Sequence, residues 1–496
     1  MKKTLRKTKT AGSALLAAAM LAGLYTGSVQ AADTDDMYTV RYAWLATAPA
    51  DLKAVEAAAN EYLAEKAGIQ VELYPLSYSN YAEQINLMIT GGEKLDVITE
   101  LSTTFTSDVA MNKLVPLDDL LEEYGQDAMG YLGEYIEACR VNGEVFAMPT
   151  IRDMAASQGV LLKTEALEAA GIDPASVTTI EQVDEVFAKL KEGRDSALIV
   201  PQTISTTIYE NIFMNYDALG DTIGVLMNYG QDDLEVVNLF ETEEYEKNIR
   251  KIREWYEKGY ILSDVATNTD DGATLMSADK ILGITNMLKP GVESQVSANM
   301  GGVDMTMIET SEPICSTYNV QSVGMAIPIT CGDDEAAMKF LNLLYSDPVL
   351  INLLDFGIEG THYVKTDVDN VITFPEGKDM SNSGYAMFDG WQRGNQLLSY
   401  VWEGDDPDLY EQLDAFNKSA LRSKAFGFVF DASAVKTETA AIANVTAQYR
   451  AALENGTLDI DENLPKFQAA LKEAGIDRVI EEKQAQLDAW AAENLE

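Results

Sequence analysis

The stretch "IQVELYPLSYSNYAEQINLMITGGEKLDVITEL", residues 69–101, decides the fold class because its periodicity changes twice. Apolar and polar side chains alternate up to Leu76, which is typical of a strand with one buried face. Asn80 and Glu83 have the spacing of a helix N-terminus, and the helical pattern that follows ends at the glycine pair 91–92. The closing "LDVITEL" is typical of a buried strand. The stretch therefore predicts a strand, a helix and a second strand.

The residues before this stretch extend the same alternation. Residues 37–47 predict a strand and residues 51–67 a helix, so the order is strand, helix, strand, helix, strand. This order predicts an α/β sheet with right-handed crossovers. Ligands of such sheets bind beyond the carboxyl ends of the strands. We therefore expect the ligand-binding residues of this part of the chain to be Trp44, Tyr78, Ser102 and Thr103.

The rest of the chain predicts a second lobe and a helical C-terminal part. The short β-type run at 141–154 is interrupted by Pro149, where the chain is expected to leave the first lobe. A second sheet-like pattern, "VGMAIPIT", covers residues 323–330, and the last third is mostly helical. About 465 residues exceed one ordinary core. Because no low-complexity linker divides the chain, two lobes joined by crossing strands are favoured over separate domains.

Two further pairs of residues are candidates for ligand binding. Arg152 and Asp153 lie just beyond Pro149, and this pair either binds ligand hydroxyls or bridges the lobes. The guanidinium favours binding for Arg152 because it offers five donors, whereas Asp153 favours a structural role. Trp391, with Asn395 in "FDGWQRGNQ", offers a flat aromatic face beside amide groups, as a sugar ring requires. A core position for Trp391 is an equally good interpretation.

The N-terminus predicts export. Five basic residues and no acidic ones precede the apolar run 14–24, which is too short to span a bilayer, so residues 1–31 are expected to be a cleaved signal peptide. Its removal takes five positive charges and changes the net charge from −44 to −49. Such an acidic protein repels polyanions, so we expect no nucleic acid partner.

Enzymatic, metal and cofactor motifs are missing from the sequence. There is no G-x-S-x-G, P-loop, H-E-x-x-H or G-x-G-x-x-G pattern, and carboxylate pairs occur by chance among 80 acidic residues. One histidine, His362, and three dispersed cysteines do not supply the four nearby N or S ligands that a structural zinc site needs. A bridge between Cys315 and Cys331 is left open. We therefore expect no catalytic residues, no metal and no cofactor.

Several stretches together resemble the extracellular solute-binding proteins of ABC importers, of the sugar-binding type. They are "YPLSYSNYAEQINLMITGGEKLDVI", "LVPLDDLLEEYG", "VNGEVFAMPTIRD" and "AIPITCGDDEAAMKFLNLLYSDPVLINLLDFGIEGTHY". The C-terminal stretch that begins "SKAFGFVFDASAVKTETAAI" resembles the domain of uncharacterised function that closes a lipoprotein-like subgroup of this family. The resemblance covers nearly the whole mature chain.

The resemblance implies a periplasmic-binding-protein-like fold, in which two α/β lobes joined by hinge strands close over a ligand. We expect lobe I to comprise residues 32–149 plus about 308–357. Lobe II is expected to comprise 150–307 plus about 358–496, including a helical C-terminal extension. In this subgroup "GIEGTHY" matches a loop after a helix, so His362 is expected to be structural.

The implied function is capture of a small-molecule solute, an oligosaccharide, for ABC permease subunits by a monomeric protein. Subgroup members carry a lipid on a cysteine after Leu-Ala-Gly, but here residues 21–23 are followed by Leu24. Lipid anchoring is thus in question, and the protein is expected to be secreted or held at the cell surface. A binding protein for peptides or other solutes and a secreted carbohydrate-active enzyme are the alternatives.

Overall fold

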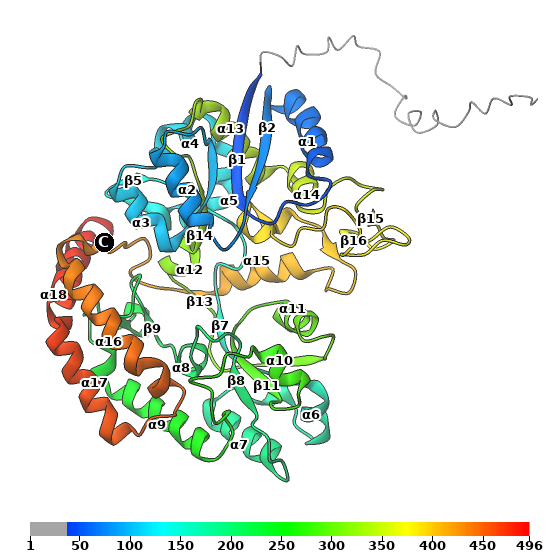
Figure 1. Ribbon diagram of the computed structural model, residues 1–496. Helices are drawn as coiled ribbons and strands as arrows, with labels where there is room; N and C mark the ends of the chain where they lie inside the picture. Colours follow the sequence, from blue (N-terminus) through cyan, green and yellow to red (C-terminus); the bar gives the residue numbers. More distant parts are fainter. Residues whose placement is uncertain (1–36, 496) are drawn as a thin grey trace, which may run out of the picture.

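The computed structural model describes residues 37–495, so the expected signal peptide and Leu24 lie outside the described residues. Two α/β lobes lie one above the other, and three long C-terminal helices flank them on one side (Figure 1). The two-lobe fold predicted from the sequence is confirmed.

Lobe I is built on a five-stranded sheet of order β2-β1-β3-β14-β6. Strands β1, β2 and β3 are parallel, as the alternating pattern predicted, whereas β14 runs antiparallel to β3. The strands are β1 (Tyr38–Leu45), β2 (Ile69–Leu76), β3 (Val97–Leu101), β6 (Met148–Pro149) and β14 (Val323–Ala326). The helices are α1 (Leu52–Lys66), α2 (Tyr81–Thr90), α3 (Ser102–Ala110), α4 (Asp118–Tyr124), α5 (Gln126–Leu132), α13 (Asp334–Ser346) and α14 (Pro348–Phe356), while α12 (Thr317–Gln321) lies in a segment that connects the lobes.

Lobe II is built on a four-stranded sheet of order β12-β7-β11-β8. Strand β7 is antiparallel to both of its neighbours, and β8 is parallel to β11. The strands are β7 (Ser157–Lys163), β8 (Ile199–Pro201), β11 (Gly283–Leu288) and β12 (Met305–Glu309). The helices are α6 (Thr164–Ala169), α7 (Ile180–Lys191), α8 (Ile208–Ile212), α9 (Glu243–Glu257), α10 (Gly272–Ser277) and α11 (Val292–Asn299).

The chain passes between the lobes at residues 150–156, 310–322 and 404–423. The second and third passages are hydrogen-bonded to each other, because β13 (Ile314–Cys315) pairs in parallel with β18 (Leu421–Arg422). The third also contains α15 (Leu409–Ser419), which lies between the lobes in Figure 1. These connected passages give the lobes a hinge.

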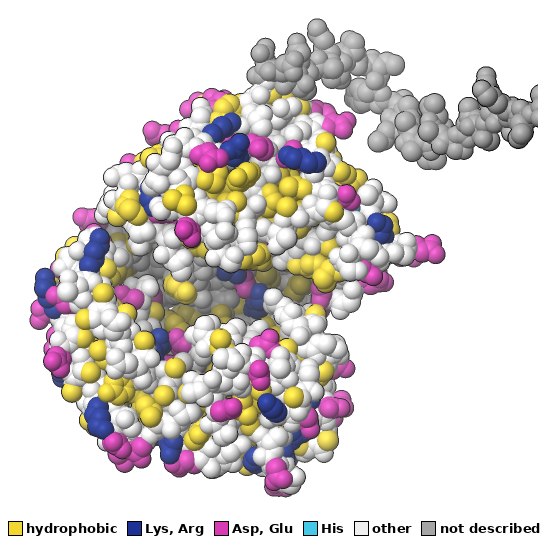
Figure 2. Space-filling view, in the orientation of Figure 1, with side chains coloured by type: hydrophobic (Ala, Val, Ile, Leu, Met, Phe, Trp, Pro, Cys, Tyr) yellow, Lys and Arg dark blue, Asp and Glu magenta, His cyan; other side chains and the backbone are white. Residues whose placement is uncertain are grey.

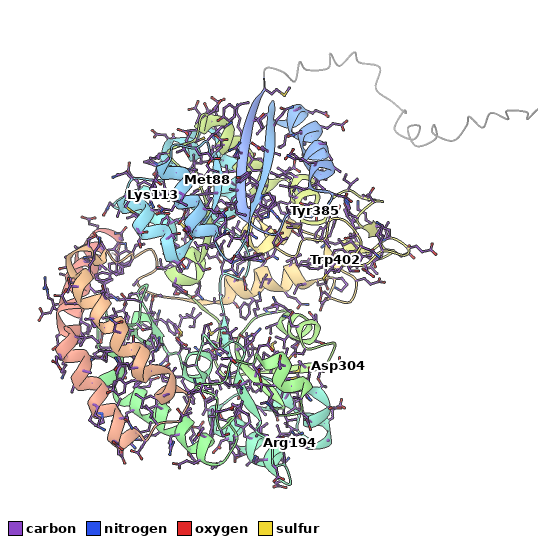
Figure 3. All side chains as sticks on the ribbon, in the orientation of Figure 1. Met88, Lys113, Arg194, Asp304, Tyr385 and Trp402 are labelled. Atoms are coloured by element: carbon purple, nitrogen blue, oxygen red, sulfur yellow. The ribbon has the colours of Figure 1, made fainter. Side chains whose placement is uncertain are left out.

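Residues 358–403 belong with lobe I, whereas the sequence suggested lobe II. The Asp51 amide donates to the Gly384 carbonyl at 3.0 Å. The Gln392 side chain donates through Nε2 to the Leu45 carbonyl at 2.9 Å and accepts through Oε1 from the Leu45 amide at 3.0 Å. Tyr385 is part of the lobe I core. Figure 3 labels Tyr385 and Trp402 in the upper lobe. Long-range hydrogen bonds to the loop after β1 therefore determine where this segment packs.

A three-stranded sheet lies within this segment. It consists of β15 (Val364–Lys365), β16 (Val371–Thr373) and β17 (Val401–Trp402). His362 precedes it in the turn after α14, is 1% exposed and accepts a hydrogen bond from the Ile358 amide at 2.8 Å through Nδ1. This histidine is structural, as expected. Cys315 and Cys331 are free thiols, so the bridge left open is not formed.

The C-terminal helices pack on lobe II. They are α16 (Lys436–Glu454), α17 (Ile460–Ala474) and α18 (Ile476–Asn494). Their apolar residues, among them Ile442, Phe467 and Val479, belong to the same core as β7, α7 and α9. The helical extension predicted from the sequence is thus an integral part of lobe II.

Candidate ligand-binding cleft

The carboxyl ends of the parallel strands in the two lobes face the same crossing segments. In lobe I, Leu101 at the end of β3 pairs with Val323, which directly follows the second passage. In lobe II, Leu288 at the end of β11 pairs with Ser157, which directly follows the first. The loops after these strands therefore meet between the lobes, where α/β proteins bind ligands. Figure 2 shows the molecule hollowed between the upper and lower lobes.

A charged cluster lies where the first passage leaves lobe I. The Arg152 guanidinium pairs with Asp153, and it also donates to Ser322 Oγ of the second passage at 2.7 Å. Lys289, directly after β11 of lobe II, places its Nζ 2.5 Å from Asp153. Three separate parts of the chain thus contribute to one partly exposed polar cluster.

The charges in this cluster are matched. Burial alone would raise the pKa of the Asp153 carboxyl, but the Lys289 and Arg152 cations outweigh it and hold the pKa below its ordinary value. Asp153 therefore stays ionised at neutral pH. The cluster keeps one net positive charge with several N–H donors, which suits the hydroxyl and carbonyl oxygens of a polar ligand.

Two aromatic residues, Trp391 and Tyr78, come from lobe I. Trp391 is half-buried, and its carbonyl accepts a hydrogen bond from Thr150 Oγ1 of the first passage at 3.1 Å. Tyr78, in the loop after β2, is 54% exposed. Partial burial and the Asp389 carboxylate raise the pKa of Tyr78, whose hydroxyl lies near Gln392, the neighbour of Trp391. The loop after β2 and the chain at Trp391 thus approach each other in lobe I, next to the passage that carries Arg152.

Ser102 is close to this cluster as well. Its amide donates to the carbonyl of Ser322, the residue that accepts from Arg152, at 3.2 Å. Ser102 is half-buried and Thr103 is exposed. The structure thus places six of the eight expected residues at the facing ends of the strands or at the hinge: Tyr78, Ser102, Thr103, Arg152, Asp153 and Trp391.

Trp44 and Asn395 do not face the cleft, which corrects the expectation for both. Trp44 lies within β1, is 1% exposed, and stacks on Tyr42 in the lobe I core. Asn395 is also 1% exposed: its Oδ1 accepts from the Leu397 amide and its Nδ2 donates to the Tyr345 carbonyl. Strand β1 continues to Leu45 and is buried on both faces there, with Trp44 in one core cluster and Leu45 in another, so Trp44 is enclosed.

Sequence reasoning missed Lys289 and the buried groups that hold Trp391. Lys289 directly follows β11, so the rule that singled out Tyr78 would have found it had that strand been predicted. Arg393 is 1% exposed and bonds both Asp355 and Asp389, and the Trp44 indole donates to Asp389 at 2.9 Å. This network fixes the chain on either side of Trp391.

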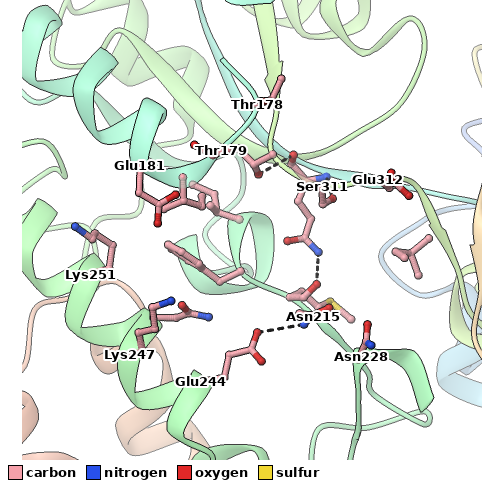
Figure 4. Close-up of a pocket in the computed structure, with 18 of the residues that line it drawn as sticks. Thr178, Thr179, Glu181, Asn215, Asn228, Glu244, Lys247, Lys251, Ser311 and Glu312 are labelled. Carbon is pink, nitrogen blue, oxygen red and sulfur yellow. Dashed lines mark hydrogen bonds between the residues drawn. The ribbon is translucent and has the colours of Figure 1, made fainter. Parts of the chain in front are cut away.

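A separate pocket of about 690 Å³ lies on lobe II (Figure 4). It is bordered by the start of α7, by α9 and by the passage residues Ile314 and Leu421. Glu181, Lys247 and Lys251 line one side. None of the eight expected residues lines this pocket. None of its lining residues comes from a loop that follows a parallel strand of lobe I. We therefore take the space between the lobes as the candidate site.

Within residues 37–495, no cluster of three or more His, Cys, Asp or Glu side chains could hold a metal ion. No helix in the same range is long and apolar enough to cross a membrane.

Glu100, two residues before Ser102, makes stability depend on pH. It is 3% exposed, and burial raises the pKa of its carboxyl to about 8. The folded state thus holds a proton that the unfolded chain releases from about pH 4.5, so this group destabilises the fold increasingly as pH rises toward 8. We expect Glu100→Gln, which keeps the acceptor for Thr104 Oγ1, to remove this loss.

The gain in unfolding free energy from Glu100→Gln should be about 3 kcal/mol larger at pH 8 than at pH 5. Urea unfolding at both pH values measures this difference, with Glu83→Gln, at an exposed position of α2, as the control. An equal gain at both pH values would show that Glu100 ionises normally.

The fold and the interlobe site define a two-lobe binding protein, and comparison with known proteins gives its family. Residues 46–350 match the family model described as bacterial extracellular solute-binding protein, and residues 424–492 match a domain of unknown function (DUF3502). The chain belongs to the bacterial extracellular solute-binding proteins.

Two relatives from Streptococcus pneumoniae cover almost the whole chain. One, from serotype 4 (strain ATCC BAA-334 / TIGR4), is a carbohydrate ABC transporter substrate-binding protein, 26% identical over 479 residues, 96% of each chain. The other is the N-glycan transport solute binding protein NgtS, whose crystal structure has a TM-score of 0.82 at 25% identity and covers 92% of this chain and 100% of that one. NgtS in complex with Man5GlcNAc has a TM-score of 0.69, over 92% and 99% of the two chains.

Proposed function

We propose that this protein binds a neutral oligosaccharide between its lobes and delivers it to the membrane subunits of an ABC importer. The observation that carries the proposal is the Arg152–Asp153–Lys289 cluster at the interlobe hinge, with the exposed Tyr78 and the half-buried Trp391 contributed by lobe I. Sugar rings present apolar C–H faces and hydroxyl edges, so an aromatic surface beside charged donors suits them.

The solved relatives support this ligand class. NgtS was crystallised in complex with Man1GlcNAc and with Man5GlcNAc. We take Man5GlcNAc as the first oligosaccharide to test. The net charge of −44 disfavours strongly anionic ligands at long range, which also favours a neutral glycan.

Binding is proposed to favour a closed arrangement of the lobes. Arg152 belongs to a passage whereas Lys289 belongs to lobe II, and Tyr78 belongs to lobe I. A ligand that contacts all three is bound most tightly when the lobes are close, so it shifts the population toward the closed form. The permease would then recognise that form.

We propose a monomeric, exported protein that performs no catalysis and binds no nucleic acid. The family consists of binding proteins, and the sequence has none of the hydrolase motifs considered above. Whether the chain is tethered depends on residues 1–31.

Thermal unfolding of residues 32–496 with mono-, di- and oligosaccharides, and with peptides, tests the proposal. A ligand at about 100 times its Kd adds roughly 2.7 kcal/mol to the stability of the folded state, so a shift in Tm is expected with an oligosaccharide recovered intact. A shift with peptides alone would indicate a peptide receptor, and hydrolysis of the sugar would indicate an enzyme.

A further inference from the structure

The C-terminal helices meet lobe II at one buried carboxylate. Glu454, the last residue of α16, is 0% exposed. It accepts hydrogen bonds from Thr207 Oγ1 at 2.7 Å, from Arg450 Nε at 2.8 Å and from the Tyr245 hydroxyl at 3.3 Å. A buried carboxylate is costly unless charged and polar partners surround it, so this contact is specific rather than a by-product of apolar packing.

The partners of the C-terminal helices converge on the first turn of α8. Thr207 is the N-cap of α8 and forms a capping box with Glu210. Arg450 Nη2 donates to the other oxygen of Glu210 at 2.8 Å, and Asn455 Oδ1 accepts from the Ile208 amide at 3.0 Å. The first amides of a helix lack intrahelical partners. Side chains from the C-terminal part therefore complete the start of α8.

This turn ends the loop that follows β8. The loop begins at Gln202, whose amide donates to the Thr285 carbonyl of β11 at 3.1 Å, and it ends at Thr207. Because β8 is parallel to β11, the loop lies at the edge of the lobe II sheet that faces lobe I. Ile204 within it is 69% exposed. In Figure 1, α8 lies in the upper part of the lower lobe.

Between its ends the loop is loosely supported. A cavity of about 60 Å³ is lined by Thr203, Ile204 and Thr206 on the loop side, and by Ala451 and Asn455 of the C-terminal part. Packing thus leaves space beneath the loop. Within the loop, Thr203 bonds Ser205 and Thr206, and Asn211 of α8 donates to Thr206 Oγ1 at 3.4 Å, so the loop is attached to lobe II mainly near its ends.

We propose that the C-terminal domain positions the 202–207 loop as the lobe II wall of the ligand cleft, and that Glu454 is the positioning residue. The domain of unknown function thereby acquires a role in ligand binding. The inference rests on the proposed function only in naming the cleft as the ligand site.

Glu454→Gln in the chain of residues 32–496 tests the role of the carboxylate, because the amide keeps the size but loses the charge that pairs with Arg450. Glu462→Gln is the matched control, since Glu462 forms an exposed ion pair with Lys466 on α17 and does not contact the loop. Hydrogen exchange without ligand is measured first. We expect exchange of the amides in 203–208 to be at least ~10-fold faster in Glu454→Gln, with the β7 and β11 amides unchanged.

Binding is measured next, with Man5GlcNAc as the probe. We expect an affinity about 10-fold lower for Glu454→Gln than for Glu462→Gln. Exchange of 203–208 equal to the control would overturn the proposal, and so would an equal acceleration throughout the chain, which would indicate a general loss of stability. If the wild type does not bind Man5GlcNAc, the proposed ligand fails, and the exchange result still decides whether Glu454 positions the loop.

Discussion

Replacing Asp389 by alanine is expected to lower the free energy of unfolding by about 3–5 kcal/mol, because it breaks a buried ion pair. Asp389 is 3% exposed and receives both Arg393 Nη1 at 2.6 Å and Nη2 at 2.7 Å. Without it, the guanidinium retains only Asp355, at 2.8 Å, and the indole N–H of Trp44 has lost its acceptor. Both are desolvated groups, for which a missing partner is costly.

Urea unfolding of Asp389→Ala, Asp389→Asn and Asp414→Ala measures this loss. The asparagine variant keeps an acceptor for Trp44 but not the charge, so its loss of stability should be intermediate. Asp414 forms an exposed ion pair with Lys418 on α15, and such a pair is worth less than about 1 kcal/mol. A loss below about 1 kcal/mol for Asp389→Ala would mean that the network does not hold this part of lobe I together.

The second large effect is expected for ligand binding by Arg152→Ala. Hydrogen bonds to a charged group contribute about 1.5–3 kcal/mol, so removing the guanidinium should weaken the binding of Man5GlcNAc by roughly 10- to 100-fold. The fold should tolerate this change, because Asp153 keeps Lys289 as its partner and Arg152 is partly exposed. The expected change in unfolding free energy is below about 1 kcal/mol.

Titration calorimetry and urea unfolding separate the two effects. Arg140→Ala is the control, since Arg140 pairs with Asp118 and Glu137 on the surface of lobe I, away from the hinge. It should leave the affinity unchanged. Arg152→Lys keeps the charge without the planar fork and should bind with intermediate affinity. If Arg152→Ala binds like the wild type, Arg152 serves only to connect the two passages.

Local patterns in the sequence were sufficient to predict the regular elements. The alternation in 69–76 and the helix signals at Asn80 and Gly91 depend on neighbours a few residues apart, and β2 and α2 form where they were expected. Helix α7 likewise begins at a capping box of Thr179 and Gln182, which is a pattern of residues only three positions apart. Tyr78 and Ser102 were named as candidates by a local rule as well, because each of them follows a predicted strand.

The errors concern contacts between residues that are far apart in the chain. Residues 358–403 have little regular structure, and their place in lobe I is determined by contacts such as Gln392 with Leu45, 347 positions away. Trp44 was placed in the cleft because the end of β1 could not be located to within one residue. Lys289 was missed because β11 was not predicted, and its contact with Asp153, 136 positions away, leaves no local signal in the sequence.

The cleft between the lobes is proposed to bind a neutral oligosaccharide without altering it. Isothermal titration of Man5GlcNAc into residues 32–496, with the sugar analysed afterwards, tests this most directly. We predict saturable binding of one glycan per chain and recovery of the glycan intact. No detectable heat of binding at millimolar glycan, for Man5GlcNAc and for the other neutral oligosaccharides of the thermal panel, would contradict the account.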